Sequence, residues 1–197
     1  MEKIDFSSEA VTSEAELREL IGVPHNYVLK KSISILDEHC RRFIEMSPLL
    51  FLSTSNANGT CTVSPRGDLP SEINILNQTQ LVIPDRPGNK RLDSFENILS
   101  NPHVGLVFLI PGLDEVLRIN GKATIIQNKE ILDKLSKTGK PPLLGIGVDV
   151  EECFIHCSRA LKKSRIWNPD TWLDKEALPS SLDIFHAHLK ISGVELK

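Results

Sequence analysis

The shortness of the connections between strand-like segments constrains this chain more than any other feature. Segment 49–55 is joined to segment 61–67 by NANGT, which contains an Asn-Gly turn signal. Five residues likewise separate segment 103–110 from segment 116–126. Connections of this length cannot hold the crossover helix that two parallel strands need. The sequence therefore predicts an antiparallel sheet and disfavours a doubly wound parallel one.

Six segments have the pattern of strands. Segment 103–110 is almost entirely apolar and is expected in the middle of the sheet. An Asn-Gly interruption in segment 116–126 predicts a bulge or bend. An antiparallel sheet of this size usually closes into a barrel, because closure removes its exposed edges. We therefore expect a mainly β fold, a six-stranded antiparallel barrel with flanking helices. The expected strands are 49–55, 61–67, 80–85, 103–110, 116–126 and about 146–156.

Helical periodicity marks further segments around and between these strands. Ser13 can cap the first helix, and Glu16 completes a capping box. The helix that ends at Asn101-Pro102 is expected to bury Leu92, Phe95, Ile98 and Leu99. No repeat or linker divides the chain, so residues 1–197 are expected to form one domain. Its parts are N-terminal helices over 1–46, the barrel over 47–160 and a C-terminal segment over 161–197. The expected helices are 13–21, about 32–46, 91–102, 128–139 and patches within 174–190.

The composition limits the partners of this chain of 197 residues. Its net charge of −3 gives no global attraction to nucleic acid or to an anionic membrane. Apolar runs fall short of the roughly 20 residues of a membrane helix, and the polar, acidic N-terminus is no signal peptide. A cytoplasmic protein is expected, with its four cysteines as free thiols. The cluster Cys153, His156 and Cys157 divides between two faces of a strand, which favours packed thiols over a zinc site.

The stretch PDRPGNKRLDS, residues 84–94, gathers positive charge in an acidic chain. Arg86, Asn89, Lys90 and Arg91 lie in a Gly-Pro loop that leads into an expected helix. The free N–H groups of a first helical turn attract an anion, and Arg and Lys side chains add to this attraction. An exposed basic loop is the alternative, but basic residues there oppose the helix dipole. The stretch is therefore interpreted as a phosphate site.

Three other segments carry candidate site residues. In SPRGD, Ser64 and Arg66 end a strand at an opening that Pro65 and Gly67 create, although a solvated Arg–Asp pair is the alternative. In LRING, a charge between apolar residues is also typical of the solvent face of a strand. Late in the chain, Trp167 beside Arg165 can cover a flat ring by stacking, or can anchor the tail to the barrel.

The order of these pieces is more specific than any one of them. A hairpin with SPRGD is followed by LVIPDRPGNKRLDS, a helix closing with Asn-Pro, an apolar strand and a strand with LRINGKA. This order resembles the pyridoxamine 5′-phosphate oxidase-like superfamily of FMN-binding split barrels. The greatest similarity is to the branch with the signatures IPDRPGNxRLDS and HCxxAxxxSxxW, over about residues 35–168, and not to the true vitamin B6 oxidase.

The resemblance implies a homodimer of split barrels with FMN at the subunit interface. It implies that Ser64 and Arg66 contact the flavin and its phosphate. It also implies that Arg165 and Trp167 reach the flavin region from the other subunit. The phosphate and ribityl oxygens would be held by Arg86, Asn89, Lys90 and Arg91. The R-L-H-D-R and R-x-x-x-L-K motifs of the vitamin oxidase are missing, so pyridoxamine phosphate is not the expected substrate.

The implied function is that of an FMN-dependent oxidoreductase with an unidentified small-molecule substrate. None of the six histidines has a spacing partner that singles it out as a general base. Three alternatives stay open: a flavin carrier or sensor without turnover, a related barrel that binds deazaflavin F420 or haem, and a protein-interaction module without a ligand.

Overall fold

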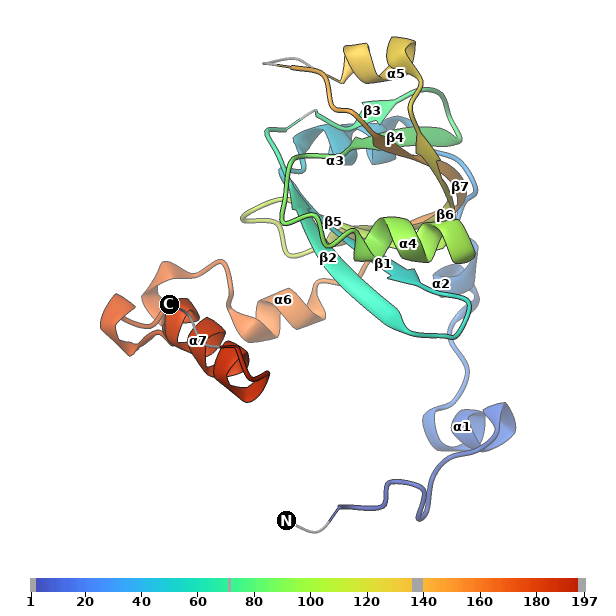
Figure 1. Ribbon diagram of the computed structural model, residues 1–197. Coiled ribbons are helices and arrows are strands. Elements are labelled where there is room, and N and C mark those ends of the chain that lie inside the picture. Colours follow the sequence, from blue (N-terminus) through green and yellow to red (C-terminus); the bar gives the residue numbers. More distant parts are fainter. Residues whose placement is uncertain (1–2, 71, 136–139, 195–197) are drawn as a thin grey trace.

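The computed structural model describes residues 3–70, 72–135 and 140–194. Its centre is a seven-stranded antiparallel sheet. Its strand order is β2-β1-β5-β6-β7-β4-β3. Figure 1 shows the sheet curling into a barrel, with β3 and β4 facing β1 and β2 across the interior. The strands are β1 (Leu49–Ser55), β2 (Cys61–Gly67), β3 (Asn74–Ile75), β4 (Gln80–Pro84), β5 (His103–Leu109), β6 (Val116–Ile126) and β7 (Gly145–His156).

The predicted antiparallel barrel is confirmed, with two differences. The short strand β3 was not expected, because a two-residue strand leaves no periodic pattern in a sequence. The sheet is also open rather than closed, which agrees with the split barrel that the family resemblance implies: β2 and β3 are its two edges, and no ladder of backbone hydrogen bonds joins them in the described residues. The barrel is therefore split along one side, which we call the seam, between β2 and the β3–β4 hairpin.

The described residues contain seven α-helices. Ser13 caps the first of them by accepting a hydrogen bond from the backbone N–H of Glu16, as predicted. Two short 3₁₀ turns, Pro169–Thr171 and Lys175–Ala177, precede the last helix. The helices are α1 (Glu14–Ile21), α2 (Asn26–Lys30), α3 (Glu38–Met46), α4 (Asp93–Ser100), α5 (Lys129–Lys134), α6 (Arg159–Ser164) and α7 (Ser181–Ile191). The end of the predicted helix 128–139 lies outside the described residues.

The predicted helix over 32–46 begins six residues later than expected. Asp37 caps α3 by accepting a hydrogen bond from the backbone N–H of Cys40. Before it, Ile33 forms an antiparallel bridge with Cys153 on β7, with backbone N···O distances of 3.0 and 2.6 Å. Ile33 and Leu36 therefore pack on the barrel from an extended segment and not from a helix.

Helix α4 lies against β1, β2 and β6 and starts later than predicted, at Asp93. Its buried side chains are Ser94, Phe95, Asn97 and Ile98. Leu92 and Leu99, which were expected to be buried, are exposed. The buried Asn97 amide donates to the hydroxyl oxygens of Thr54 and Thr62, at 2.9 and 3.0 Å. This polar contact fixes the helix to the hairpin that carries SPRGD.

The core fills the inside of the barrel. Leu52, Leu106, Phe108 and Ile119 are almost fully buried. The predicted bulge in β6 falls between Asn120 and Gly121. A side chain at position 121 would collide with the carbonyl oxygen of Asp149, so this close approach of two strands requires glycine.

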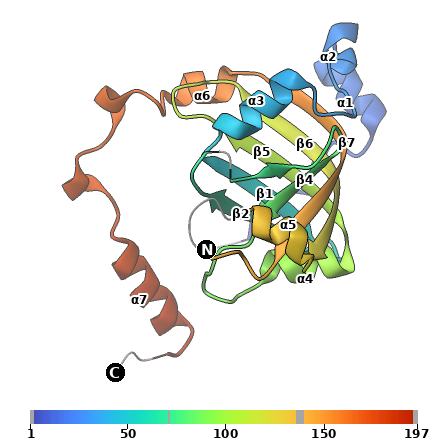
Figure 2. The same cartoon turned by 90° about the horizontal axis from the view of Figure 1, so that it is seen from above.

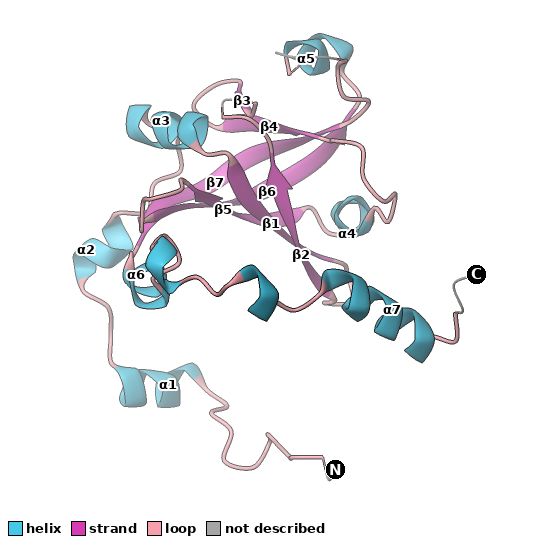
Figure 3. Ribbon diagram, turned by 90° about the vertical axis from the view of Figure 1, so that its left-hand side faces the viewer, coloured by secondary structure: helices cyan, strands magenta, loops and turns pink. Residues whose placement is uncertain are grey.

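The ends of the chain extend away from the barrel. Figures 1 and 2 show α1 and α7 leaving the sheet in separate directions, and Figure 3 shows the long path between α6 and α7. None of the residues of α1, α2 and α7 is buried. Among the described residues, no helix combines the length and apolar character needed to cross a membrane.

The cysteines fall into two groups, and all four are free. Cys40 on α3 and Cys153 on β7 are buried, with their sulfur atoms 3.4 Å apart. Burial raises the pKa of both thiols. Cys61 and Cys157 are exposed. Cys157 lies beyond the end of β7, so the cluster that contains it does not share one strand.

Candidate functional site

One groove of about 900 Å³ collects six of the eight predicted site residues. Three segments that are distant in the sequence form it: the end of β2, the loop from Asp85 into α4, and residues 140–143. The six residues are Ser64, Arg66, Arg86, Asn89, Lys90 and Arg91. The two stretches that the sequence separates by about twenty residues therefore face the same space.

The groove is basic although the chain is acidic. Its lining holds five basic side chains against two carboxylates, those of Asp85 and Asp93. The chain as a whole carries a net charge of −3. A concave surface with one dominant sign of charge attracts ligands of the opposite sign. The five basic residues are Arg66, Arg86, Lys90, Arg91 and Lys140.

The loop before α4 has an unusual backbone. Lys90 and Leu92 have φ angles of 61° and 60°, in the left-handed region that non-glycine residues rarely adopt. The side-chain oxygen of Asn89 accepts a hydrogen bond from the backbone N–H of Arg91 at 3.0 Å. Backbone strain of this kind is concentrated at ligand-binding segments.

Arg66 lies at the seam with part of its hydrogen-bonding capacity unused. One terminal nitrogen is 3.4 Å from the carboxylate of Asp85, which directly follows β4. The Nε atom is buried and has no hydrogen-bond partner. Among the described residues it is the one buried side-chain N or O atom in this state. A buried donor without an acceptor is costly, so this position favours a ligand that brings one.

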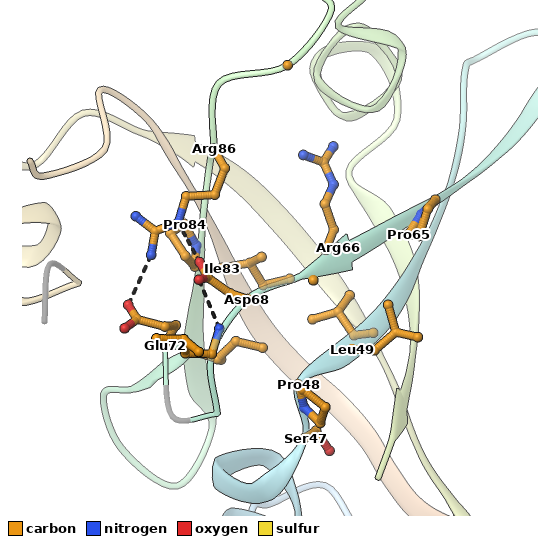
Figure 4. A pocket seen from close by; sticks show the side chains of 15 residues that line it. Ser47, Pro48, Leu49, Pro65, Arg66, Asp68, Glu72, Ile83, Pro84 and Arg86 are labelled. Atoms are coloured by element: carbon orange, nitrogen blue, oxygen red, sulfur yellow. Dashed lines mark hydrogen bonds and ion pairs between the residues drawn. The ribbon is translucent and has the colours of Figure 1, made fainter. Parts of the chain in front are cut away.

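Arg86 lines the groove, and two carboxylates on the β2–β3 connection hold its guanidinium (Figure 4). Its Nε donates to Asp68 at 2.5 Å, and a terminal nitrogen donates to Glu72 at 3.0 Å. The alternative interpretation of SPRGD paired Arg66 with Asp68. The structure instead crosses the pairs: Asp68 holds Arg86, and Asp85 holds Arg66.

The start of α4 lies at the groove without a capping side chain. Leu92 precedes the helix and makes no side-chain capping bond. Arg91 is mostly exposed and forms an ion pair of 2.6 Å with Asp93 in the first helical turn. Asp93 therefore already interacts with the helix dipole and with Arg91, and an incoming anion would compete with it.

The other two predicted residues do not line this groove in their own chain. Arg165 ends α6 in an exposed position with φ 52°. The indole N–H of Trp167 donates to the carbonyl oxygen of Leu113 in the β5–β6 loop at 3.0 Å. Within one subunit Trp167 thus anchors the chain after α6. Arg118 of LRING lies 5.2 Å from the centre of the Phe154 ring, outside the groove.

The sequence analysis missed one basic residue of the groove and the carboxylates that pair with its arginines. Lys140 lies about fifty residues after the basic loop, in a segment without a distinctive pattern. Glu72 and Asp85 were not expected to bind the arginines, and Asp68 was considered only as a partner of Arg66. Ion pairs between distant segments leave no periodic pattern, so only the folded chain reveals them.

A protein-family model described as pyridoxamine 5′-phosphate oxidase matches residues 36–157. The chain belongs to this family. The six groove residues lie inside the matched span of the pyridoxamine 5′-phosphate oxidase family, whereas Arg165 and Trp167 lie beyond it. The groove is thus part of the family's shared region.

Among similar solved structures, a HupZ variant with a TM-score of 0.50 supports the fold. A single-residue variant of HupZ from Group A Streptococcus has 15% sequence identity and a TM-score of 0.50, covering 61% of this chain and 99% of that one. A candidate pyridoxamine 5′-phosphate oxidase from Lactobacillus delbrueckii has 23% identity and a TM-score of 0.49, covering 62% and 95%. The haem storage protein HutZ from Vibrio cholerae has 16% identity and a TM-score of 0.39, covering 61% and 93%. No curated protein sequence matches the chain.

Proposed function

We propose that this protein is an FMN-binding flavoprotein, a homodimer that acts as an oxidoreductase on a small molecule. The observation that carries the proposal is the convergence of six predicted contact residues on one basic groove of an acidic chain. Membership of the pyridoxamine 5′-phosphate oxidase family supports the same conclusion, because FMN-binding split barrels are the expectation for this family.

The groove fits a phosphate ester in size and in chemistry. Its volume of about 900 Å³ is within the range of roughly 300–1,000 Å³ that is common for cofactor sites. Lys90 and Arg91 would hold the phosphate, with Arg66 supplying the donor that lacks an acceptor. Ser64 and Asn89 would hold ribityl hydroxyl groups. Arg86 would add its positive charge to the groove while it keeps both of its carboxylate partners.

When bound, FMN would supply hydride-transfer chemistry, with negative charge on the reduced ring. A nearby arginine or backbone N–H would stabilise that charge. No side chain of this protein is required as a nucleophile. The role of the protein is to bind and orient the cofactor and to exclude water from the ring.

A second subunit would complete the site. The groove has exposed apolar residues on its lining: Val63 is 65% exposed, Leu92 is 50% exposed and Leu143 is 89% exposed. Apolar surface beside a binding groove is typical of an interface with another chain. In the proposal the partner subunit covers this rim and brings Arg165 and Trp167 to the flavin.

The absorbance spectrum of the purified protein is the first test. We expect the visible bands of oxidised flavin, or tight uptake of added FMN by a colourless preparation. A haem or deazaflavin spectrum would mean that the protein binds that ligand in place of FMN. A colourless dimer that takes up no FMN at micromolar concentration would overturn the proposal.

A second experiment separates an oxidoreductase from a flavin carrier. The FMN-loaded protein is mixed with NADH or NADPH under air, and oxidation of the nicotinamide is followed by absorbance. Turnover above that of free FMN supports the enzyme. Tight FMN binding without turnover of either donor, or of a panel of artificial acceptors, favours the carrier or sensor.

A further inference from the structure

A second, smaller hollow lies at the seam (Figure 4) and shares part of its lining with the groove. Its volume is about 240 Å³, and it opens between β1, the end of β2 and β4. The two hollows share a wall formed by Pro65, Arg66, Arg86 and Gly88. A molecule in the smaller hollow would therefore lie next to whatever occupies the groove.

Apolar side chains form most of the inner surface of this hollow. Leu49 and Leu50 come from β1, Ile83 from β4, and Pro48 and Pro84 from the ends of these strands. In Figure 4 Leu49 and Ile83 face each other across the space. A surface of this kind gains free energy by covering an apolar ligand.

The charged groups at the hollow neutralise one another. Arg86 is held by both Asp68 and Glu72, and the Glu72 side chain is only 4% exposed. Arg66 is paired with Asp85. A charged ligand would have to break one of these partly buried pairs and would leave a charge unpaired, which is costly. An uncharged ligand avoids this cost.

We propose that this hollow binds a small uncharged aromatic molecule. The size is sufficient, because an apolar protein cavity of about 150 Å³ already accommodates benzene, and the hollow measures about 240 Å³. The inference does not depend on FMN, since the hollow is complete without any residue of the basic loop beyond Gly88.

Three probes of matched size test whether the hollow prefers an uncharged ligand: benzyl alcohol, benzoate and benzylamine. Their binding to the full-length protein is measured by calorimetry, with and without added FMN. We expect a dissociation constant below about 1 mM for benzyl alcohol. We expect at least roughly tenfold weaker binding of both charged probes. Equal binding of all three, or a preference for benzoate, would overturn the proposal.

Gly67 provides a way to fill the hollow without touching the groove. It lines the hollow but not the groove, and a Cβ there would lie 3.7 Å from the carbonyl oxygen of Pro48 and 3.9 Å from Leu49, which are ordinary contacts. Gly67→Val should abolish benzyl alcohol binding and leave FMN affinity within about twofold. Gly67→Ala, which adds one methyl group, should weaken it only a few-fold.

A measurement on the unmodified protein locates the probe if Gly67→Val fails to fold. With methyl-labelled protein, benzyl alcohol should shift the NMR signals of Leu49, Leu50 and Ile83 and leave those of the exposed residues Leu182 and Ile184 on α7 unchanged. Shifts confined to α7, or no shifts at millimolar probe, would contradict the proposed site. If the protein bound no FMN but benzyl alcohol still shifted these signals, only the proposed function would be overturned.

Discussion

The guanidinium of Arg66 and the carboxylate of Asp85 lie 3.4 Å apart and connect β2 with the end of β4 across the open side of the barrel. No backbone ladder joins these two strands in the described sheet, so side-chain ion pairs take its place at this point. The same arginine lines the basic groove. An incoming phosphate would therefore compete with Asp85 for Arg66, in the same ion pair that connects the two sides of the seam.

Neutralising Asp85 is expected to strengthen FMN binding. Asp85→Asn removes both a competitor for Arg66 and a negative charge from the groove lining, so FMN affinity should rise several-fold. Arg66→Gln should lower it roughly tenfold or more. Titrations followed by flavin fluorescence measure both, with Asp133→Asn on α5 as the control. A weaker affinity of Asp85→Asn would show that this carboxylate itself contacts the cofactor.

Removing the two cations of the basic loop should weaken FMN binding about a hundredfold. The double variant Lys90→Ala/Arg91→Ala loses two charge-assisted contacts with the phosphate. The matched control is Lys162→Ala/Lys163→Ala, which removes the same charge from α6, outside the groove. Equal losses in both variants would mean that only the overall charge matters, and that the loop is no phosphate site.

The buried amide of Asn97 is expected to stabilise the protein. Asn97→Ala deletes two hydrogen bonds that connect α4 to Thr54 and Thr62, and leaves those hydroxyls with fewer partners. The free energy of unfolding should fall by about 2 kcal/mol. Urea denaturation measures it, with the exposed Glu96→Ala on the same helix as control. A change below about 0.5 kcal/mol would contradict the importance of this contact.

The four thiols are expected to react at two different rates. Cys61 and Cys157 are exposed and should react quickly with a thiol reagent such as DTNB in the native protein. Cys40 and Cys153 should react only on unfolding, because burial removes access and raises the pKa of both thiols. Counting released thiolate before and after adding denaturant checks this. Four fast thiols would mean that α3 does not cover β7 in solution.

Stability should decrease below about pH 6.5 through His156. Burial lowers the pKa of His156 in the folded protein, and the charges of Arg118 and Lys31 lower it further. The unfolded chain then takes up a proton near about pH 6.5 while the folded protein still holds the neutral ring, so acid favours unfolding. The loss continues until the pH passes the lower, folded pKa.

The urea midpoint at about pH 7.5 and about pH 5.5, on either side of the unfolded pKa, measures this effect. His156→Gln is the control for the other titrating groups. The variant should lose part of the pH dependence that the wild-type protein has. An identical pH dependence in both proteins would assign the effect elsewhere.

Local sequence patterns determined the strands. The segments 49–55, 61–67 and 116–126 match β1, β2 and β6 residue for residue, because alternation and tight turns act between near neighbours. The Ser13 cap and the bulge in β6 were likewise predictable from a few adjacent residues. The clustering of basic residues also marked a basic groove, because a surplus of positive charge in an acidic chain requires a reason.

Long-range contacts decided the rest. Ile33 is extended because Cys153, 120 positions later, offers it backbone partners, and this outweighs its helical spacing. Arg86 turns toward Asp68 and Glu72, and Arg66 toward Asp85, because folding brings these carboxylates together at the seam. The sequence by itself determined six of the seven strands and where positive charge gathers. Only the tertiary structure decided which charge meets which, since Coulomb attraction depends on distance in space and not on distance along the chain.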